Sequence, residues 1–216
     1  MTDKIFKSGF ISIVGSPNVG KSTLMNTFVG QKVAIVSNRP QTTRNRIMGV
    51  MTRPDSQIIF IDTPGIHTPK NKLGQYMLKV AYSAMDEVDC ILFMADTTAG
   101  VRERDEGILA QLKKAKAPVV AAVNKIDIAS KENVAAVLGK LNTEDWLNAV
   151  IPISASKGDG LVELEKKLRS FLVPGPKYFP DDMVTDQPER VLCSEMIREQ
   201  ALVLLKEEVP HGLGVD

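Results

Sequence analysis

The residues GSPNVGKS (15–22) combine two glycines, a lysine and a serine at the spacing of a phosphate-binding loop. Gly15 and Gly20 would let the backbone curl so that successive N–H groups face anionic oxygens. Lys21 would reach the β- and γ-phosphates of a nucleotide, and Ser22 would give a hydroxyl ligand to Mg²⁺. The predicted nucleotide-binding residues of this loop are Gly15, Ser16, Pro17, Asn18, Val19, Gly20, Lys21, Ser22 and Thr23.

A second motif, DTPG (62–65), follows the apolar run IIFID. Asp62 is placed to hold Mg²⁺ directly or through water, and the N–H of Gly65 is placed to meet a γ-phosphate. The next residue is Ile66, where many nucleotide hydrolases have a glutamine that orients the attacking water, and isoleucine forms no side-chain hydrogen bond. An ordinary Asp-x-Pro-Gly turn has the same residues, so this motif alone does not indicate hydrolysis.

The motif NKID (124–127) has the residues needed to read a guanine base. The carboxylate of Asp127 can accept hydrogen bonds from the N1–H and 2-amino groups of guanine, neither of which adenine offers. Asn124 can bridge the base and the phosphate loop, and the alkyl stem of Lys125 can cover the base plane. Asn and Asp also favour strand-end turns, so NKID needs the support of its context.

That context comes from a fourth motif, SAS (154–156), and from the order of all four. The N–H of Ala155 is placed to meet guanine O6, and the predicted residues are Ser154, Ala155 and Ser156. The motifs occur in sequence, each at the end of an apolar run. Because open α/β sheets bind ligands at the carboxyl ends of their parallel strands, this placement indicates a guanine-nucleotide site.

Short, nearly continuous apolar runs must position these motifs, and helix-length amphipathic stretches separate most of them. The expected strands are FISIV (10–14), IIFID (58–62), CILFMAD (90–96), VVAAVN (119–124) and VIPIS (150–154), and the expected helices are 21–30, 73–86, 103–116, 131–141 and 160–172. This alternation predicts an α/β fold with a mostly parallel, doubly wound sheet. The turn TRPDS joins IMGVM (47–51) to QIIFI (57–61) and permits only a hairpin, hence one antiparallel edge strand.

The composition is that of a globular protein, with 44% hydrophobic and 25% charged residues. Lys and Arg number 27 against 26 Asp and Glu, so net charge gives no support for a nucleic-acid partner. Cys90 and Cys193 lack metal-ligand spacing, and Cys90 lies in an apolar run where a buried thiol is expected. Without a signal-peptide-like or membrane-spanning apolar run, the chain is expected to be cytoplasmic.

The alternation of strands and helices ends near Leu172. Residues 173–189 contain four prolines, and we interpret them as a linker and a domain boundary. Helical periodicity returns over 190–208, and the expected inner positions are Leu192, Met196, Ala201, Leu204 and Leu205. One amphipathic helix cannot bury its own apolar face, so this helix either docks on the first domain or begins a second one.

Five stretches and the linker resemble the Era family of bacterial GTPases: GSPNVGKSTLMN, PQTTRNRIMGV, IIFIDTPGIH, AVNKID and SASKGDG. The resemblance implies a Ras-like P-loop G domain with a six-stranded sheet over 1–172, the linker over 173–189, and part of an α+β KH domain over 190–216. The family's KH domain clamps nucleotides with a GXXG loop, and no two glycines of this chain have that spacing. We therefore expect the chain to stop within the KH domain.

The resemblance further implies a slow GTPase that binds GTP or GDP with Mg²⁺ and assists assembly of the small (30S) ribosomal subunit by binding 16S rRNA. It places Thr43, or alternatively Thr42, in the first switch as a ligand of Mg²⁺ beside Ser22 and Asp62, with the attacking water held by the backbone there. Asn in the position of Asn18 holds K⁺ in related GTPases, so stimulation by potassium is expected. The implied catalytic residues are Lys21, Thr43, Gly65 and Asn18.

Other readings stay open on the residues alone. Ile66 favours a nucleotide-sensing binding module with negligible turnover. A P-loop kinase or ATPase is a further alternative, against which NKID argues, as is a related GTPase acting in tRNA modification or large-subunit assembly. The resemblance is also compatible with a monomer and with peripheral association at the inner face of the cell membrane.

Overall fold

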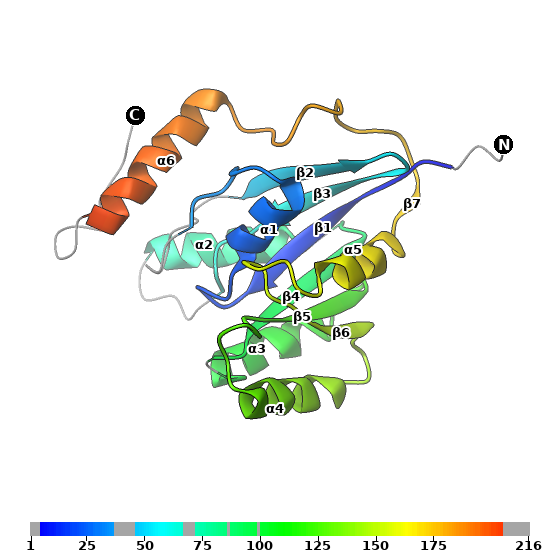
Figure 1. Ribbon diagram of the computed structural model, residues 1–216, viewed down its shortest axis with the longest axis vertical. Helices are drawn as coiled ribbons and strands as arrows, with labels where there is room; N and C mark the ends of the chain where they lie inside the picture. Colours follow the sequence, from blue (N-terminus) through cyan, green and yellow to red (C-terminus); the bar gives the residue numbers. More distant parts are fainter. Residues whose placement is uncertain (1–4, 37–45, 67–71, 86, 99, 205–216) are drawn as a thin grey trace.

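A computed structural model describes residues 5–36, 46–66, 72–85, 87–98 and 100–204. These residues form a central twisted sheet with helices on both faces (Figure 1). The strands are β1 (Lys7–Gly15), β2 (Ile47–Arg53), β3 (Ser56–Asp62), β4 (Cys90–Asp96), β5 (Val119–Asn124), β6 (Ala149–Pro152) and β7 (Val173–Pro174). Their order is β2-β3-β1-β4-β5-β6, with β7 paired to β1.

The pairing confirms the expected α/β sheet and adds one feature to it. β1, β3, β4, β5 and β6 run parallel, and β2 pairs antiparallel with β3 as the short turn required. The additional strand is β7, whose two residues pair antiparallel with Lys7 and Ser8 of β1. It was not expected, because two residues at the start of a Pro-rich stretch carry no strand periodicity.

Two groups of helices cover the two faces of the sheet. The helices are α1 (Lys21–Val29), α2 (Lys72–Ser83), α3 (Glu103–Leu112), α4 (Lys131–Asn142), α5 (Leu161–Arg169) and α6 (Glu189–Leu204). α1 and α5 pack on the face that carries Ile11 and Ile13, and α2, α3 and α4 pack on the face that carries Val14. Burial on both faces explains why the central strands are almost continuously apolar. Cys90 is fully buried, as expected.

Parallel pairing brings the predicted motifs to one edge of the sheet. β1 ends at Gly15, β3 at Asp62 and β5 at Asn124. In the sheet Ile13 lies beside Asp62, and Asp96 at the end of β4 lies beside Asn124. The phosphate-loop and DTPG motifs therefore start from neighbouring strands, and the NKID motif starts from the same edge of the sheet with β4 between β1 and β5.

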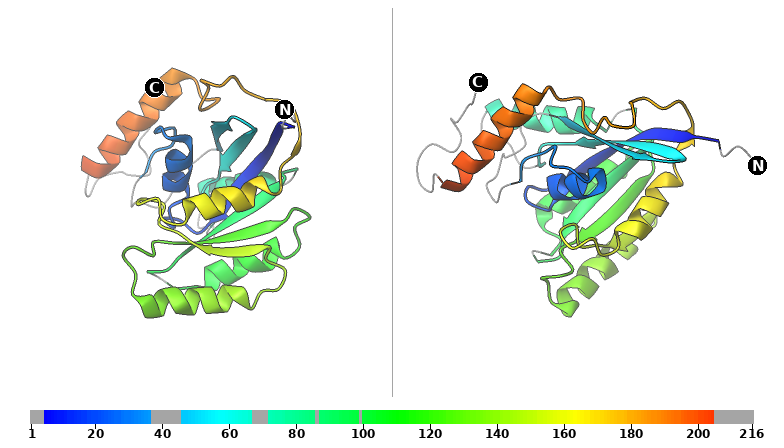
Figure 2. Two further views of the ribbon diagram at one scale, coloured as in Figure 1. Left: turned by 45° about the vertical axis from the view of Figure 1, so that its right-hand side comes forward. Right: turned by 45° about the horizontal axis from the view of Figure 1, so that its top comes forward.

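The Pro-rich segment is packed against the sheet along part of its length. The Val184 carbonyl accepts a hydrogen bond from Val50 N–H at 2.8 Å, and Thr185 Oγ1 donates to the Met48 carbonyl at 2.6 Å. The amide side chain of Gln57 bonds both the N–H and the carbonyl of Phe179, at 3.0 and 2.9 Å. Figures 1 and 2 show this segment following the β2 edge of the sheet to α6, which lies beside the sheet rather than over either face.

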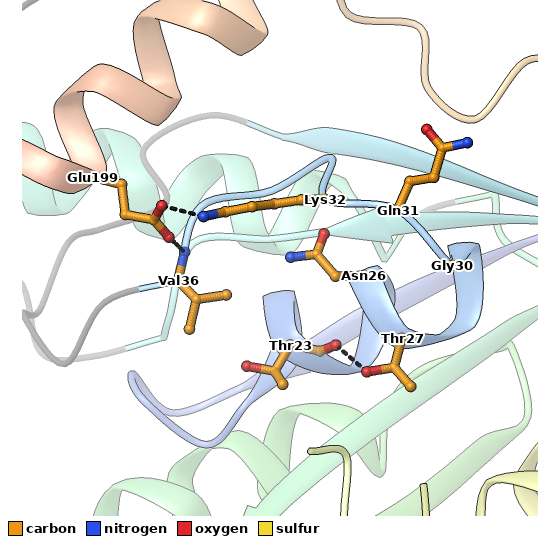
Figure 3. A pocket seen from close by; sticks show the side chains of 8 residues that line it. All are labelled: Thr23, Asn26, Thr27, Gly30, Gln31, Lys32, Val36 and Glu199. Carbon is orange, nitrogen blue, oxygen red and sulfur yellow. Dashed lines mark hydrogen bonds and ion pairs between the residues drawn. The ribbon is translucent and has the colours of Figure 1, made fainter. Parts of the chain in front are cut away.

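The helix α6 buries only part of the face that its apolar periodicity indicated, since Leu192 and Ala201 are half-buried, and the predicted Leu205 lies outside the described residues. Leu204 is 75% exposed and Met196 is 37% exposed, whereas Arg198 and Glu199 are buried. The reason lies in the contacts of Glu199, which pairs with Lys32 and accepts a hydrogen bond from Val36 N–H at 2.8 Å. These contacts close one side of a hollow of about 500 Å³ between α6, α1 and the segment that follows α1 (Figure 3). None of the helices in the described part of the chain has both the length and the apolar character needed to cross a membrane.

Candidate functional site

The loop between β1 and α1 has the backbone shape of a phosphate cradle. Gly20, just before α1, has a φ of 102°, and Asn18 has a φ of 64°. A Cβ atom on Gly20 would lie 2.3 Å from Nδ2 of Asn124, so this position needs glycine for its conformation and for the close approach. The N-terminus of α1 follows directly, which adds the partial positive charge of a helix start to the loop.

Lys21 is folded back over this loop. Its ammonium donates hydrogen bonds to the carbonyl oxygens of Gly15 at 3.1 Å and Ser16 at 3.0 Å. The side chain is almost fully buried, and burial lowers the pKa of Lys21 to about 8, although the nearby Asp62 carboxylate acts in the opposite direction. A buried ammonium whose hydrogen-bond partners among the described residues are neutral carbonyls is well suited to accept an anionic ligand.

Asp62 and Ser22 form the part of the site that fits a magnesium ion. Ser22 Oγ donates to Asp62 Oδ2 at 2.6 Å, whereas Asp62 Oδ1 is buried and has no hydrogen-bond partner among the described residues. Burial raises the pKa of Asp62 to about 6, and Lys21 and the Ser22 hydroxyl hold it lower than burial alone would. A buried carboxylate oxygen without a partner is costly, and a hard divalent cation is the ligand that carboxylate and hydroxyl oxygens suit.

The DTPG segment passes directly over the phosphate loop. A Cβ atom on Gly65 would come within 2.7 Å of Pro17 Cα, so only glycine fits this contact. The Ile66 N–H donates to the Gly15 carbonyl at 3.1 Å, and the Ile66 side chain is 5% exposed within the core on the Val14 face. Ile66 therefore serves as a core residue that anchors DTPG.

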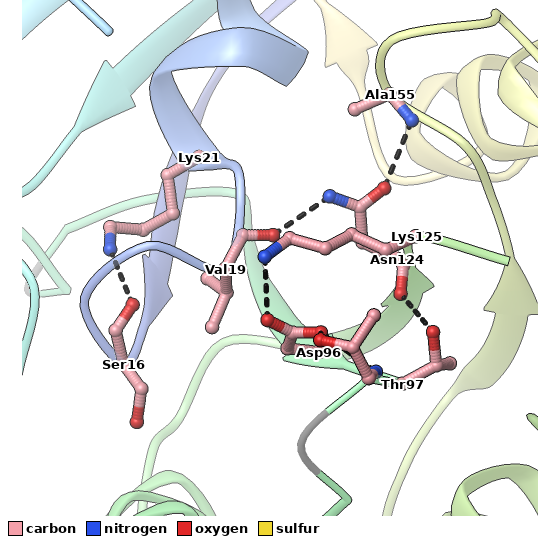
Figure 4. Close-up of polar contacts among 9 residues, drawn as sticks. Ser16, Val19, Lys21, Asp96, Thr97, Asn124, Lys125 and Ala155 are labelled. Carbon is pink, nitrogen blue, oxygen red and sulfur yellow. Dashed lines mark hydrogen bonds and ion pairs between the residues drawn. The ribbon is translucent and has the colours of Figure 1, made fainter. Parts of the chain in front are cut away.

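Asn124 is the centre of the base side of the site (Figure 4). Its Nδ2 donates to the Val19 carbonyl at 2.7 Å, and its Oδ1 accepts from the Ala155 N–H at 2.9 Å. The predicted tie between NKID and the phosphate loop is thus present, and the same side chain also holds the SAS loop. The Ala155 N–H, which the sequence assigned to guanine O6, bonds Asn124 in this structure.

Lys125 and Asp127 lie in the turn that follows β5. Lys125 has a φ of 70°, and its ammonium donates to Asp96 Oδ2 at 2.6 Å. Asp127 is exposed and its carboxylate has no hydrogen-bond partner among the residues described, so it is available to a ligand. In the SAS loop, Ser154 Oγ is buried and accepts from the Lys157 N–H at 3.2 Å. Ser154 therefore holds the loop, and its hydroxyl is turned to the protein.

The structure adds residues that the motifs did not indicate. Asp96 holds Lys125, and Thr97 donates to the Asn124 carbonyl through both its N–H, at 3.1 Å, and its hydroxyl, at 2.8 Å. Asp105 of α3 accepts a hydrogen bond from Ser16 Oγ behind the phosphate loop. The position of Asp96 at the end of an apolar run was the only available signal. The predicted residues Thr42 and Thr43 lie outside the described residues.

Comparisons with known proteins agree with this geometry. The profile of the family described as "50S ribosome-binding GTPase" matches residues 10–125. GTPase Era of Ruminiclostridium cellulolyticum is 50% identical over 98% of this chain and 71% of the relative. GTPase Era of Clostridioides difficile is 50% identical over 98% of this chain and 72% of the relative. The chain thus spans somewhat more than two thirds of the length of these relatives.

Solved structures give the same result. A crystal structure of Era in complex with MgGDPNP and nucleotides 1506-1542 of 16S ribosomal RNA matches with a TM-score of 0.89 and 45% identity, covering 95% of this chain and 70% of that one. A variant of Aquifex aeolicus Era bound to GDP.AlF4⁻ matches with the same scores and coverage. The site geometry, the sequence identity and the structural match agree, and the chain belongs to the GTPase Era family.

Proposed function

We propose that this chain binds GTP together with Mg²⁺ and hydrolyses it to GDP and phosphate. The observation that carries the proposal is that Asp62 Oδ1 is buried and has no hydrogen-bond partner among the described residues. The Ser22 hydroxyl lies beside it, bonded to the other oxygen of the same carboxylate. At the same edge of the sheet, Lys21 is buried at the start of α1, where it can meet phosphates, and Asp127 is exposed in the turn after β5, where it can meet guanine. A magnesium nucleotide is the ligand that would satisfy all of these groups together.

In the proposed reaction each residue has a limited task. Ser22, Asp62 and Thr43 would hold Mg²⁺, which supplies positive charge next to the phosphates. Lys21 would exchange its carbonyl partners for phosphate oxygens, and the Gly65 N–H would meet the γ-phosphate. Backbone groups near Thr43 would orient the attacking water, since the Ile66 side chain is packed in the core. K⁺ held by Asn18 would add charge stabilisation.

A hydrolysis assay tests this proposal. Phosphate release from GTP should require Mg²⁺, stop with excess EDTA, and resist competition by ATP because Asp127 selects guanine. Asp62→Ala should abolish it, whereas Asp145→Ala, which removes an exposed carboxylate between α4 and β6, should leave it unchanged. Absence of Mg²⁺-dependent hydrolysis by the unmodified chain would refute the proposal. Equal rates in potassium and sodium buffers would remove the role of K⁺ alone.

The family relationship also supports a role with ribosomal RNA. We propose that residues 1–172 form the GTPase domain, 173–189 the linker and 190–216 part of an RNA-binding KH domain, and that the whole protein acts in the cytoplasm on the 16S rRNA of the small subunit. Support comes from the related Era structure that contains nucleotides 1506-1542 of that RNA. The test compares the binding of this RNA segment to the 216-residue chain and to a chain extended to the length of its relatives. Failure of both to bind it in the presence of GDPNP would contradict the RNA role.

A further inference from the structure

Asp96 lies at the base side of the site but belongs to none of the four nucleotide motifs. It is the last residue of β4 and sits beside Asn124, the last residue of β5. Its Oδ2 accepts a hydrogen bond from Lys125 Nζ at 2.6 Å (Figure 4). Its Oδ1 accepts from the Thr98 N–H at 2.9 Å and the Thr98 hydroxyl at 2.6 Å. Both carboxylate oxygens are therefore committed, and one of them holds the lysine of NKID.

The pair between Asp96 and Lys125 is sheltered from solvent. Their side chains are 15% and 28% exposed, so screening by water and salt is weaker than for a surface ion pair. Burial by itself would raise the pKa of Asp96, but hydrogen bonds from Lys125 and Thr98 outweigh it and keep the pKa below its usual value. The carboxylate consequently stays ionised and bound to the ammonium through the neutral pH range.

The backbone of Lys125 is also held in one conformation. Its φ of 70° is uncommon for a residue other than glycine, and its carbonyl accepts the N–H groups of Ile128 and Ala129, each at 3.2 Å. Asp127 lies inside this turn. With its carbonyl and its ammonium both bound, Lys125 is fixed at each end, and its alkyl stem runs between them.

We propose that Asp96 is a positioning residue of the guanine site, which holds Lys125 so that its stem forms one wall of the base pocket before nucleotide binds. The inference rests on the GTP-binding function proposed above. An unrestrained lysine loses considerable side-chain entropy when it is ordered, and an ion pair that orders it in advance removes this cost from the binding step.

A purely structural role for Asp96 explains the geometry less well. The ends of β4 and β5 are already joined by Thr97, whose N–H and hydroxyl both donate to the Asn124 carbonyl. The β4 to β5 pairing continues from Ile91 to Asp96 without help from the side chain. Besides the turn at Thr98, the ammonium of Lys125 is therefore the group whose position depends on Asp96.

The test measures the dissociation constants of GDP and GTP and the single-turnover hydrolysis rate for Asp96→Ala, Asp96→Asn, Lys125→Met and the double variant Asp96→Ala with Lys125→Met. Asp96→Ala should weaken both nucleotides equally, by about 5- to 30-fold, because the base contact is the same in the ground and transition states. The hydrolysis rate of bound GTP should stay within about twofold of wild type for the same reason. Asp96→Asn, which keeps a neutral acceptor for the ammonium, should lose less affinity than Asp96→Ala.

The double variant separates the proposed role from a general effect. Once Lys125→Met has removed the ammonium, Asp96→Ala should reduce affinity by less than about twofold further. The control is Asp55→Ala, which breaks an ion pair between Asp55 in the β2–β3 turn and Arg169 at the end of α5. Both side chains of this pair are partly exposed, and its loss should not change nucleotide affinity.

Several results would overturn the inference: GDP affinity of Asp96→Ala within twofold of wild type, losses that add in the double variant, or an equal loss in Asp55→Ala. A lower unfolding temperature with unchanged GDP affinity would likewise show a structural role and overturn it. Failure of the wild-type chain to bind GDP at all would instead refute the proposed function.

Discussion

The base side and the γ-phosphate side of the nucleotide site differ in how their polar groups are occupied. On the base side, Asn124 spans the phosphate loop and the SAS loop, and Lys125 is paired with Asp96. On the γ-phosphate side, and within the described part of the chain, Lys21 donates to two neutral carbonyl oxygens and Asp62 has a buried oxygen without a partner. Asn124 and Lys125 are thus bonded within the protein, whereas Lys21 and Asp62 are suited to bind charged groups of a ligand.

This difference assigns different tasks to the two sides. A base pocket whose side chains are already bonded can discriminate between bases without reorganising, because the ordering cost was met on folding. A phosphate site that holds a buried lysine and a carboxylate with an unsatisfied oxygen gains most when an anion and a cation arrive together. The comparison predicts that changes on the base side act on folding and affinity, and that changes on the γ-phosphate side act on hydrolysis.

The largest effect is expected from Asp127, the base-side group that the protein leaves to the ligand. Asp127→Ala should reduce GDP affinity by about 3–5 kcal/mol, since it removes two hydrogen bonds to an ionised acceptor. Because the carboxylate has no partner among the described residues, the free energy of unfolding without nucleotide should change by less than about 0.5 kcal/mol. Titration with GDP measures the affinity, and urea unfolding measures the free energy of unfolding. A large loss of stability would contradict the assignment of Asp127 to the ligand.

Asn124→Ala, unlike Asp127→Ala, should have a large effect on the free energy of unfolding. It leaves the buried Val19 carbonyl and Ala155 N–H without their partner and should lower the free energy of unfolding, without nucleotide, by about 2–4 kcal/mol. Asn142→Ala changes an exposed asparagine at the end of α4 and should cost less than about 0.5 kcal/mol. If the two variants unfold at the same urea concentration, the two hydrogen bonds of Asn124 do not stabilise the protein in the absence of nucleotide.

Gly65→Ala should act on the γ-phosphate side. The added Cβ would push DTPG away from Pro17 and should raise the barrier to single-turnover GTP hydrolysis by about 1–3 kcal/mol, with a smaller effect on GDP affinity. A greater loss of GDP affinity than of hydrolysis rate would indicate that Gly65 serves the phosphate loop rather than the γ-phosphate.

The smallest effect belongs to a glycine that lies away from the site. Gly139 is inside α4, and a Cβ there would meet no heavy atom within 4 Å beyond its chain neighbours and the nearby backbone of its own helix. Gly139→Ala should therefore stabilise the protein by about 0.5–1 kcal/mol while hydrolysis stays unchanged. Thermal unfolding measures the change in stability, and the same single-turnover assay measures hydrolysis. A loss of activity would show that glycine replacement by itself disturbs the site.

Particular residues show how far the sequence predicted this structure. Gly15, Asp62 and Asn124 lie at the ends of β1, β3 and β5, as the apolar runs indicated, and the ends of parallel strands meet at one edge. Asp96 also follows an apolar run, but its role depends on the alignment of β4 with β5 and on the direction of the Lys125 side chain. Neither of these can be obtained from periodicity, which identifies strands without pairing them.

The helix α6 shows a different limit of prediction from sequence. Apolar periodicity placed Leu204 of α6 on its inner face, and the structure instead buries Glu199. Leu202 is buried too, but part of the buried face is a carboxylate that contacts Lys32 and the Val36 N–H, residues more than 160 positions away. A pattern within one helix carries no information about such a partner.

The hydrogen bonds that attach the Pro-rich segment to β2 and β3 have a mechanical consequence for the helix that follows it. A free tether of this length would let α6 swing, and its range would follow from contour length. Here Phe179, Val184 and Thr185 are each attached to the sheet, and Glu199 holds α6 at a further point. The helix should therefore tumble in solution together with the sheet as one body. A displacement of β2 should also displace α6.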